Sequence, residues 1–80
     1  MGQEEAAAVI SVQVTCYSGH TYPERPQSFT WEGQIQRVEK VEKEWREPGW
    51  KHFMVCTEKD RRFELCYYEE AGRWSAVELV

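Results

Sequence analysis

The 80-residue sequence lacks the features that mark a membrane or secreted protein. No apolar run approaches the roughly 18–20 residues of a membrane span. The longest apolar stretch, AAAVISV over residues 6–12, follows Glu4 and Glu5, whereas a signal peptide begins with a basic region. Three cysteines form an odd count without paired spacing, which argues against a disulfide framework and favours a reducing compartment. We therefore expect a cytoplasmic chain without a membrane partner.

The sequence also lacks the motifs of common catalytic and cofactor sites. It has no glycine-rich phosphate loop and no nucleophile elbow of the GxSxG type. Cys56 and His52 lie on one predicted strand but are separated by roughly 13 Å, too far for proton transfer. We expect no enzymatic activity, no catalytic residue and no cofactor.

Potential zinc ligands are present without the spacing of a zinc site. Neither CxxC nor HxxxH occurs, although Cys16 and His20 have a plausible local spacing. Cys56 and Cys66 are predicted on the same outer face of adjacent strands, within one pairing step of each other if the loop between the strands spans three to five residues. We interpret these two as half-exposed thiols. The fifth potential zinc ligand is His52, and we expect no metal to be bound.

The chain has little excess of positive charge on which a nucleic acid would depend. It carries 14 acidic residues against 10 basic ones, a net charge of −4. This balance disfavours a partner held chiefly through phosphate contacts. The basic residues are concentrated after residue 33, however, so the sequence still allows a local basic patch there.

What the sequence does contain is a series of short alternating segments. Residues 1–8 are predicted as a disordered tail and residues 9–80 as a single β domain. From Val9 the apolar residues recur with period two, which places Ile10, Val12, Val14 and Cys16 on one face of a strand.

Four further segments are predicted to form strands joined by turns. SFTWEGQIQRV is a hairpin pattern in which Phe29 and Trp31 share a face, and Glu32-Gly33 is a serviceable but not ideal turn. Pro48-Gly49 marks a second turn. WKHFMVCTE and RFELCYYEE alternate in phase around KDR, and RWSAVELV ends the chain as a strand.

Residues 34–45 are ambiguous. Ile35, Val38, Val41 and Trp45 are spaced as on a helix face. A long bent strand with a bulge near Glu39–Val41 would also place Val38, Val41 and Trp45 on one side, and we favour it. The expected fold is all-β: a small antiparallel meander or open barrel of five to six strands, similar in size to SH3-like or OB-like domains. The alternative is an α+β fold with residues 34–45 helical.

Aromatic residues are abundant, with four tryptophans and four tyrosines. Large rings fill the thin cores of small β domains, and we assign the following residues to the core: Phe29, Trp31, Phe53, Phe63, Tyr67 and Trp74. The remaining aromatics, with two arginines, are predicted to form a partner-binding rim: Tyr17, Tyr22, Arg25, Trp45, Arg46 and Trp50. The same residues would also serve to close one end of a barrel.

The aromatic pattern resembles that of a known family. It consists of Pro26, Phe29-x-Trp31-x-Gly33, Val38-x-x-Val41-x-x-x-Trp45, Phe53-x-Val55, Phe63-x-Leu65-x-Tyr67 and Trp74, within residues 23–77. This arrangement is similar to a family of small bacterial β domains without established chemistry. Similar domains stand at the C-terminal end of catalytically degenerate Y-family DNA polymerase-like proteins of mutagenic repair. The resemblance implies an all-β accessory domain in a DNA-damage setting and supplies no catalytic residues.

We therefore expect a non-enzymatic protein-interaction module. Its partner would be another protein, or a second copy joined through an edge strand. The alternative is a single-stranded nucleic-acid binder that uses the same aromatics together with Lys51, Arg61 and Arg62.

Overall fold

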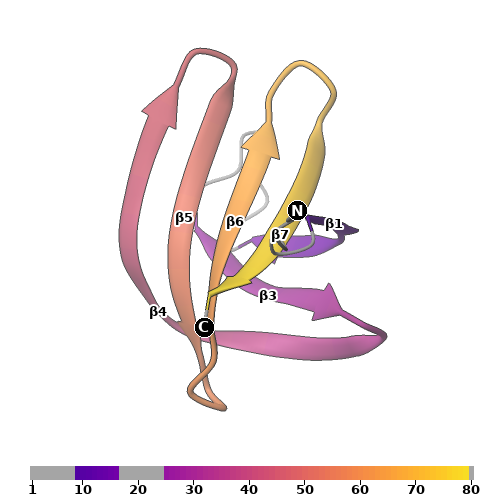
Figure 1. The fold of residues 1–80 in the computed structure, drawn as a ribbon, viewed down its shortest axis with the longest axis vertical. Helices are drawn as coiled ribbons and strands as arrows, with labels where there is room; N and C mark the ends of the chain where they lie inside the picture. The colour runs from indigo at the N-terminus through magenta and orange to yellow at the C-terminus, as the bar shows by residue number, and fades with distance from the viewer. Residues whose placement is uncertain (1–8, 17–24, 80) are drawn as a thin grey trace, which may run out of the picture.

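The computed structural model describes residues 9–16 and 25–79, and within these ranges the protein is all-β and antiparallel (Figure 1). The predicted tail, residues 1–8, lies outside the described residues. The described strands follow the order β1-β7-β6-β5-β4-β3-β2 across one sheet. Their bounds are β1 Ile10–Val12, β2 Val14–Cys16, β3 Pro26–Trp31, β4 Gln34–Glu47, β5 Trp50–Thr57, β6 Arg62–Tyr68 and β7 Arg73–Leu79. The described residues include no helix of the length and apolarity that a membrane span requires.

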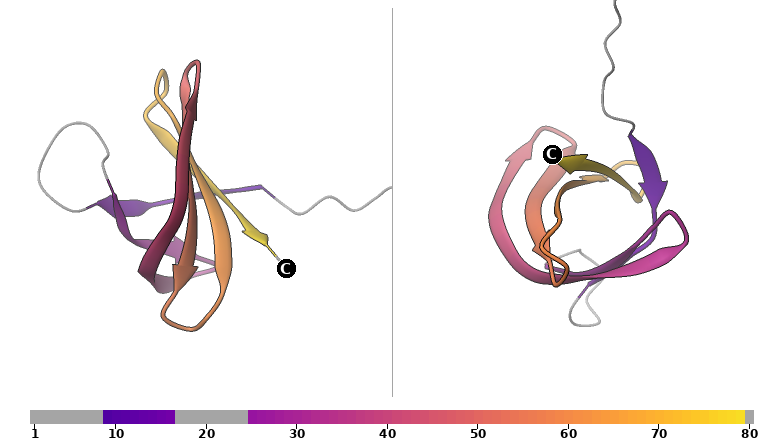
Figure 2. Two further views of the ribbon diagram at one scale, coloured as in Figure 1. Left: turned by 90° about the vertical axis from the view of Figure 1, so that its left-hand side faces the viewer. Right: turned by 60° about the horizontal axis from the view of Figure 1, so that its bottom comes forward.

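The sheet curls into a nearly closed barrel because its two end strands are consecutive in the chain. β1 pairs with β7, and after Gln13 the chain continues as β2, which pairs with β3 (Figure 2). The N-terminal strand expected from the alternating pattern is thereby divided in two. This division is why the described sheet has seven strands where five to six were expected. The predicted alternation itself is confirmed, since Ile10, Val12 and Val14 pack against the core.

The core is a set of residues from the inner faces of β3, β5, β6 and β7: Phe29, Trp31, Phe53, Val55, Phe63, Leu65 and Ala76. Phe63 is fully buried, and its ring meets Phe29 and Trp31 edge-on, at centroid distances of 4.9 and 5.0 Å. Such edge-to-face pairs add to the free energy gained by burying the rings. Tyr67 and Trp74, also expected in the core, are half-buried, and Trp74 packs against it.

β4 is a long bent strand, so the helical alternative for residues 34–45 is wrong. Its first half pairs with β3 and its second half with β5, with pairing shifts between Val38 and Lys40 and again between Val41 and Lys43. The first shift is the predicted bulge. The second was not expected, and it moves Trp45 to the face opposite Val41, where Trp45 pairs with His52. The expectation that Val38, Val41 and Trp45 share one side is therefore wrong for Trp45.

Two hairpins project beyond the barrel and are tied together near their tips. In Figure 1 the β4–β5 and β6–β7 hairpins extend in the same direction from the ring of strands. The Glu69 amide donates a hydrogen bond to the Gly49 carbonyl at 2.9 Å, and the Arg46 guanidinium pairs with the Glu69 carboxylate. These links hold the outer face of β4, β5 and β6, meaning the side turned away from the core, as one continuous surface.

Candidate functional site

Alternation along β5 and β6 places chemically active side chains on the outer face. Phe53, Val55 and Leu65 point into the core, so their neighbours in the chain point away from it. His52 lies directly opposite Cys66 in the β5–β6 pairing. Glu64 stands two residues before Cys66 and shares its face.

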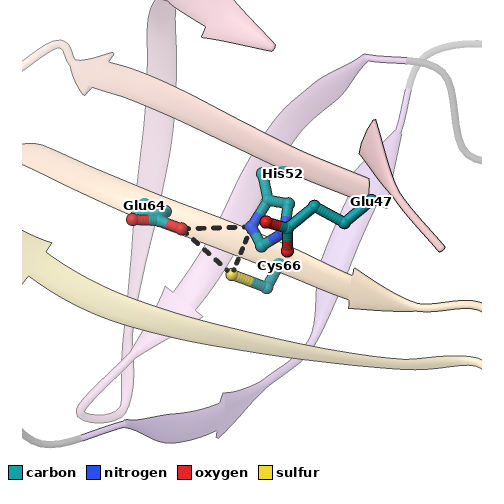
Figure 3. Close-up of polar contacts among 4 residues, drawn as sticks. All are labelled: Glu47, His52, Glu64 and Cys66. Carbon is teal, nitrogen blue, oxygen red and sulfur yellow. Dashed lines mark hydrogen bonds and ion pairs between the residues drawn. The ribbon is translucent and has the colours of Figure 1, made fainter. Parts of the chain in front are cut away.

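His52, Glu64 and Cys66 form a compact polar cluster (Figure 3). His52 Nδ1 lies 3.1 Å from Glu64 Oε2 and 3.2 Å from Cys66 Sγ. Cys66 Sγ lies 3.4 Å from Glu64 Oε2. The other imidazole nitrogen, His52 Nε2, lies 3.1 Å from Glu47 Oε1 at the end of β4. The side chain of His52 is 11% exposed, and both of its ring nitrogens face a carboxylate.

The electrostatics of this cluster act most strongly on the thiol. Partial burial, together with the adjacent Glu64 carboxylate, raises the pKa of Cys66 to about 12. Cys66 thus keeps its proton near neutral pH and donates a weak hydrogen bond to Glu64. Cys66 contacts one nitrogen of His52, and Glu47 contacts the other. This is the arrangement of a catalytic nucleophile, its general base and the acid that orients the base. Because the thiolate is the reactive form, a carboxylate that disfavours it makes nucleophilic catalysis a poor fit.

Aromatic rings surround the histidine on the outer face. The indole of Trp45 stacks on the His52 imidazole at a centroid distance of 5.0 Å and an interplanar angle of 5°. Trp50 lies 6.3 Å from His52 and stacks on Tyr68 at 4.7 Å, both measured between ring centroids. We call these four rings, Trp45, His52, Trp50 and Tyr68, the aromatic strip. Trp50 is 37% exposed, so the strip presents apolar area to solvent near the tips of the projecting hairpins.

A scan against protein-family models finds no match to this chain, and searches of curated proteins and of solved structures also find none. Evidence on function therefore comes from the chain's own geometry.

The structure separates the residues predicted to form one rim. Trp45 and Trp50 share the outer face, whereas Arg46 alternates onto the opposite face and pairs with Lys51 across the strands. Arg25 is exposed immediately before β3 and lines a depression with residues of the bend in β4. Tyr17 and Tyr22 lie outside the described residues.

The basic residues considered for nucleic-acid binding do not gather around the aromatic strip. Arg61 makes two hydrogen bonds to Glu78, at 2.8 and 3.0 Å, and Arg62 pairs with Glu42 at 3.0 Å. Lys51 lies on the core side of the sheet, where its ammonium approaches the Phe53 ring. Two of the three cations are thus engaged by carboxylates, and the third is on the other face from the strip.

The polar cluster was missed because of the strand register. Cys66 is paired with His52, and Cys56 with Arg62, so the expectation that Cys56 and Cys66 lie within one pairing step is wrong. The loop between β5 and β6 is Glu58-Lys59-Asp60, closed by a hydrogen bond from the Thr57 amide to the Arg61 carbonyl. Asp60 adopts a φ of 67°, as the last residue of a three-residue hairpin loop does. Assigning the loop to these residues would have placed His52 opposite Cys66 from the sequence.

Proposed function

We propose that this chain is a non-enzymatic protein-interaction module that contacts its partner through the aromatic strip. The observation that carries the proposal is Trp50, a large side chain exposed on a sheet face and stacked in line with Tyr68 and His52. Rigid aromatic side chains with exposed area are the residues most enriched at binding hot spots. The raised pKa of Cys66 supports the expectation that the neighbouring cluster is not a thiol nucleophile.

A protein partner is favoured over single-stranded nucleic acid by the charges near the strip. Glu47 and Glu64 both contact His52, in the middle of the strip. Carboxylates at this position would repel a phosphate backbone, and Arg61 and Arg62 are occupied by Glu78 and Glu42. The resemblance to the C-terminal domain of polymerase-like repair proteins supports a partner from the DNA-damage response.

A second copy of the chain joined through a sheet edge is the less favoured form of partner. The ends of the strand order are β1 and β2, of three residues each, and from Val38 to Glu47 β4 pairs with β5 alone among the described strands. Two of these edges are short, and the third is rich in glutamate and lysine, whose charges disfavour the addition of a strand. The aromatic strip therefore supports side-chain contacts better than strand addition.

The proposal is tested by comparing Trp50→Ser with the matched control Ile35→Ser. Ile35 is a second exposed large hydrophobic residue, at 68% exposure, in the first half of β4. Immobilised wild type and both variants are exposed to extract of the source cells, and retained proteins are identified. We expect a protein retained by wild type and Ile35→Ser but lost by at least tenfold with Trp50→Ser.

Two further measurements decide between the alternatives. Sedimentation of wild type across a concentration series reveals self-association, which Trp50→Ser should abolish if the second copy binds at the aromatic strip and leave unchanged if the copies join through a sheet edge. Quenching of tryptophan fluorescence by a single-stranded oligonucleotide, weakening steeply with salt, would replace the proposal with nucleic-acid binding. Identical profiles for wild type and Trp50→Ser would remove the aromatic strip as the contact surface.

A further inference from the structure

We propose that His52, Glu64 and Cys66 bind a divalent transition-metal ion of the zinc class on the outer face of the β5–β6 hairpin (Figure 3). This inference does not rest on the proposed interaction function. It rests on the positions of three ligand atoms and of the groups that orient them.

The first argument is the geometry of the ligand atoms. Zinc bonds of about 2.0–2.3 Å place the ligands of a tetrahedral ion roughly 3.3–3.8 Å apart. In the cluster the corresponding separations are 3.1, 3.2 and 3.4 Å, between Nδ1, Oε2 and Sγ. Outward movements of a few tenths of an ångström would accommodate the ion. All three side chains come from two paired strands, so the backbone already holds them together.

The second argument is the chemistry of the donor set. Imidazole nitrogen, thiolate sulfur and carboxylate oxygen are the three protein donors that zinc accepts, and their mixture excludes the hard ions magnesium and calcium. A Cys66 thiolate and the Glu64 carboxylate together neutralise the dication. On binding, the thiol proton that Cys66 now donates to Glu64 is released to solvent.

The third argument is the contact on the far side of the imidazole. A histidine that ligates a metal almost always donates its second ring N–H to a carboxylate or carbonyl, which fixes the tautomer. His52 Nε2 faces Glu47 Oε1 at 3.1 Å, and with its hydrogen on Nε2 the ring turns the lone pair of Nδ1 toward Glu64 and Cys66. Trp45, stacked flat on the ring, restrains its rotation. Glu47 is therefore a positioning residue.

The fourth coordination position is on the solvent side of the cluster. The side chain of Glu64 is 30% exposed and Cys66 is half-buried, so the ion can enter from the outer face. Three protein ligands with one open position leave room for water, or for a donor atom of a molecule bound at the aromatic strip.

The experiment is a titration of the purified full chain, kept reduced, with Co²⁺ as the probe and Zn²⁺ as the competitor. We expect a thiolate-to-cobalt charge-transfer band and the intense visible bands of tetrahedral cobalt at one equivalent, both removed by Zn²⁺. Cys66→Ser should abolish the charge-transfer band. His52→Gln and Glu64→Gln should each weaken cobalt binding by more than about tenfold, since each replaces a strong ligand with an uncharged carboxamide that coordinates such ions weakly.

The matched control is Cys56→Ser. Cys56 lies on the same outer face of β5, but it pairs with Arg62 and is outside the cluster. The Cys56→Ser variant should bind cobalt as wild type does. A charge-transfer band that survives Cys66→Ser, or that disappears in Cys56→Ser, would place the ion elsewhere and overturn the proposal.

Glu47 provides a test that separates positioning from folding. Glu47→Ala should weaken cobalt binding by about 10–100-fold, while Glu47→Gln, whose amide oxygen still accepts from Nε2, should bind close to wild type. Equal binding by both variants would remove Glu47 from the site. Amide NMR spectra establish that each variant is folded, and Glu64→Gln, the least disruptive change, decides the proposal if Cys66→Ser does not fold. No cobalt spectrum in wild type would show that the cluster is a hydrogen-bonded network only.

Discussion

At the scale of single residues, Gln36 places a carboxamide in an aromatic core. It pairs with Phe29 across β3 and β4 and is 2% exposed. Its Oε1 has no hydrogen-bond partner among the described residues. A buried acceptor without a partner loses its hydration and gains nothing in return, which costs about 1–3 kcal/mol of folding free energy.

We predict that Gln36→Met stabilises the protein by about 1 kcal/mol, because methionine has a similar shape and no acceptor to desolvate. The free energy of unfolding in urea measures the effect. Gln34→Met, at an exposed position beside the turn that begins the same strand, is the control and should stay within about 0.5 kcal/mol of wild type. A destabilised Gln36→Met would mean that Oε1 is hydrogen-bonded in solution.

At the scale of elements, periodicity was a good guide to which segments are strands and a poor guide to their register. The two segments WKHFMVCTE and RFELCYYEE were predicted to alternate in phase, and this is confirmed, since Phe53 and Val55 are buried opposite Leu65 and Phe63. The position of Trp45 was not, because a second bulge at Glu42 reverses the alternation after Val41. A bulge changes the face of every later residue while leaving the apolar pattern before it unaltered.

The β3–β4 turn offers a test of local conformation. Glu32 and Gly33 adopt φ values of 50° and 80°, as in a type I′ turn. Asparagine tolerates a positive φ better than glutamate, so Glu32→Asn should raise the free energy of unfolding by up to about 1 kcal/mol.

Gly33→Ala is the opposing variant for this turn. A methyl group at position 33 meets nothing within 4 Å, so its effect is conformational strain alone. It should lower the free energy of unfolding by about 1–2 kcal/mol. Urea unfolding of the two variants compares them directly, and equal stability of Gly33→Ala and wild type would contradict the turn geometry.

At the scale of the whole molecule, closure of the barrel depends on contacts between distant segments. At Gln13 the N-terminal segment stops pairing with β7, as β1, and begins pairing with β3, as β2. The Gln13 carbonyl accepts a hydrogen bond from the Thr30 amide at 3.0 Å. Elsewhere, Arg61 after the β5–β6 loop makes a two-bond ion pair with Glu78 in the last strand. The hydrogen bonds from Arg61 lower the pKa of Glu78 below its ordinary value.

This pair predicts a pH dependence of stability. Because the pKa of Glu78 is lower in the folded than in the unfolded chain, its contribution is complete above the ordinary value of 4.5 and is lost as the pH falls through the folded pKa. Glu78→Gln should therefore reduce stability at pH 7 and flatten the decline between about pH 5 and 3. Arg61→Gln should flatten it similarly. Urea unfolding as a function of pH is the measurement, and an unchanged acid limb in both variants would contradict the prediction.

The sequence by itself determined the all-β class, the alternation of β1 and β2, the Glu32-Gly33 and Pro48-Gly49 turns and the four buried aromatic residues of the core, since strand periodicity and turn composition are local properties and large apolar rings are buried in most contexts. Only the tertiary structure decided where the barrel closes, which face Trp45 occupies, and that His52 meets Cys66, Glu64 and Glu47. These features depend on the register between strands. Register is settled by loop conformation and bulges, and one residue of difference exchanges the two faces of a strand.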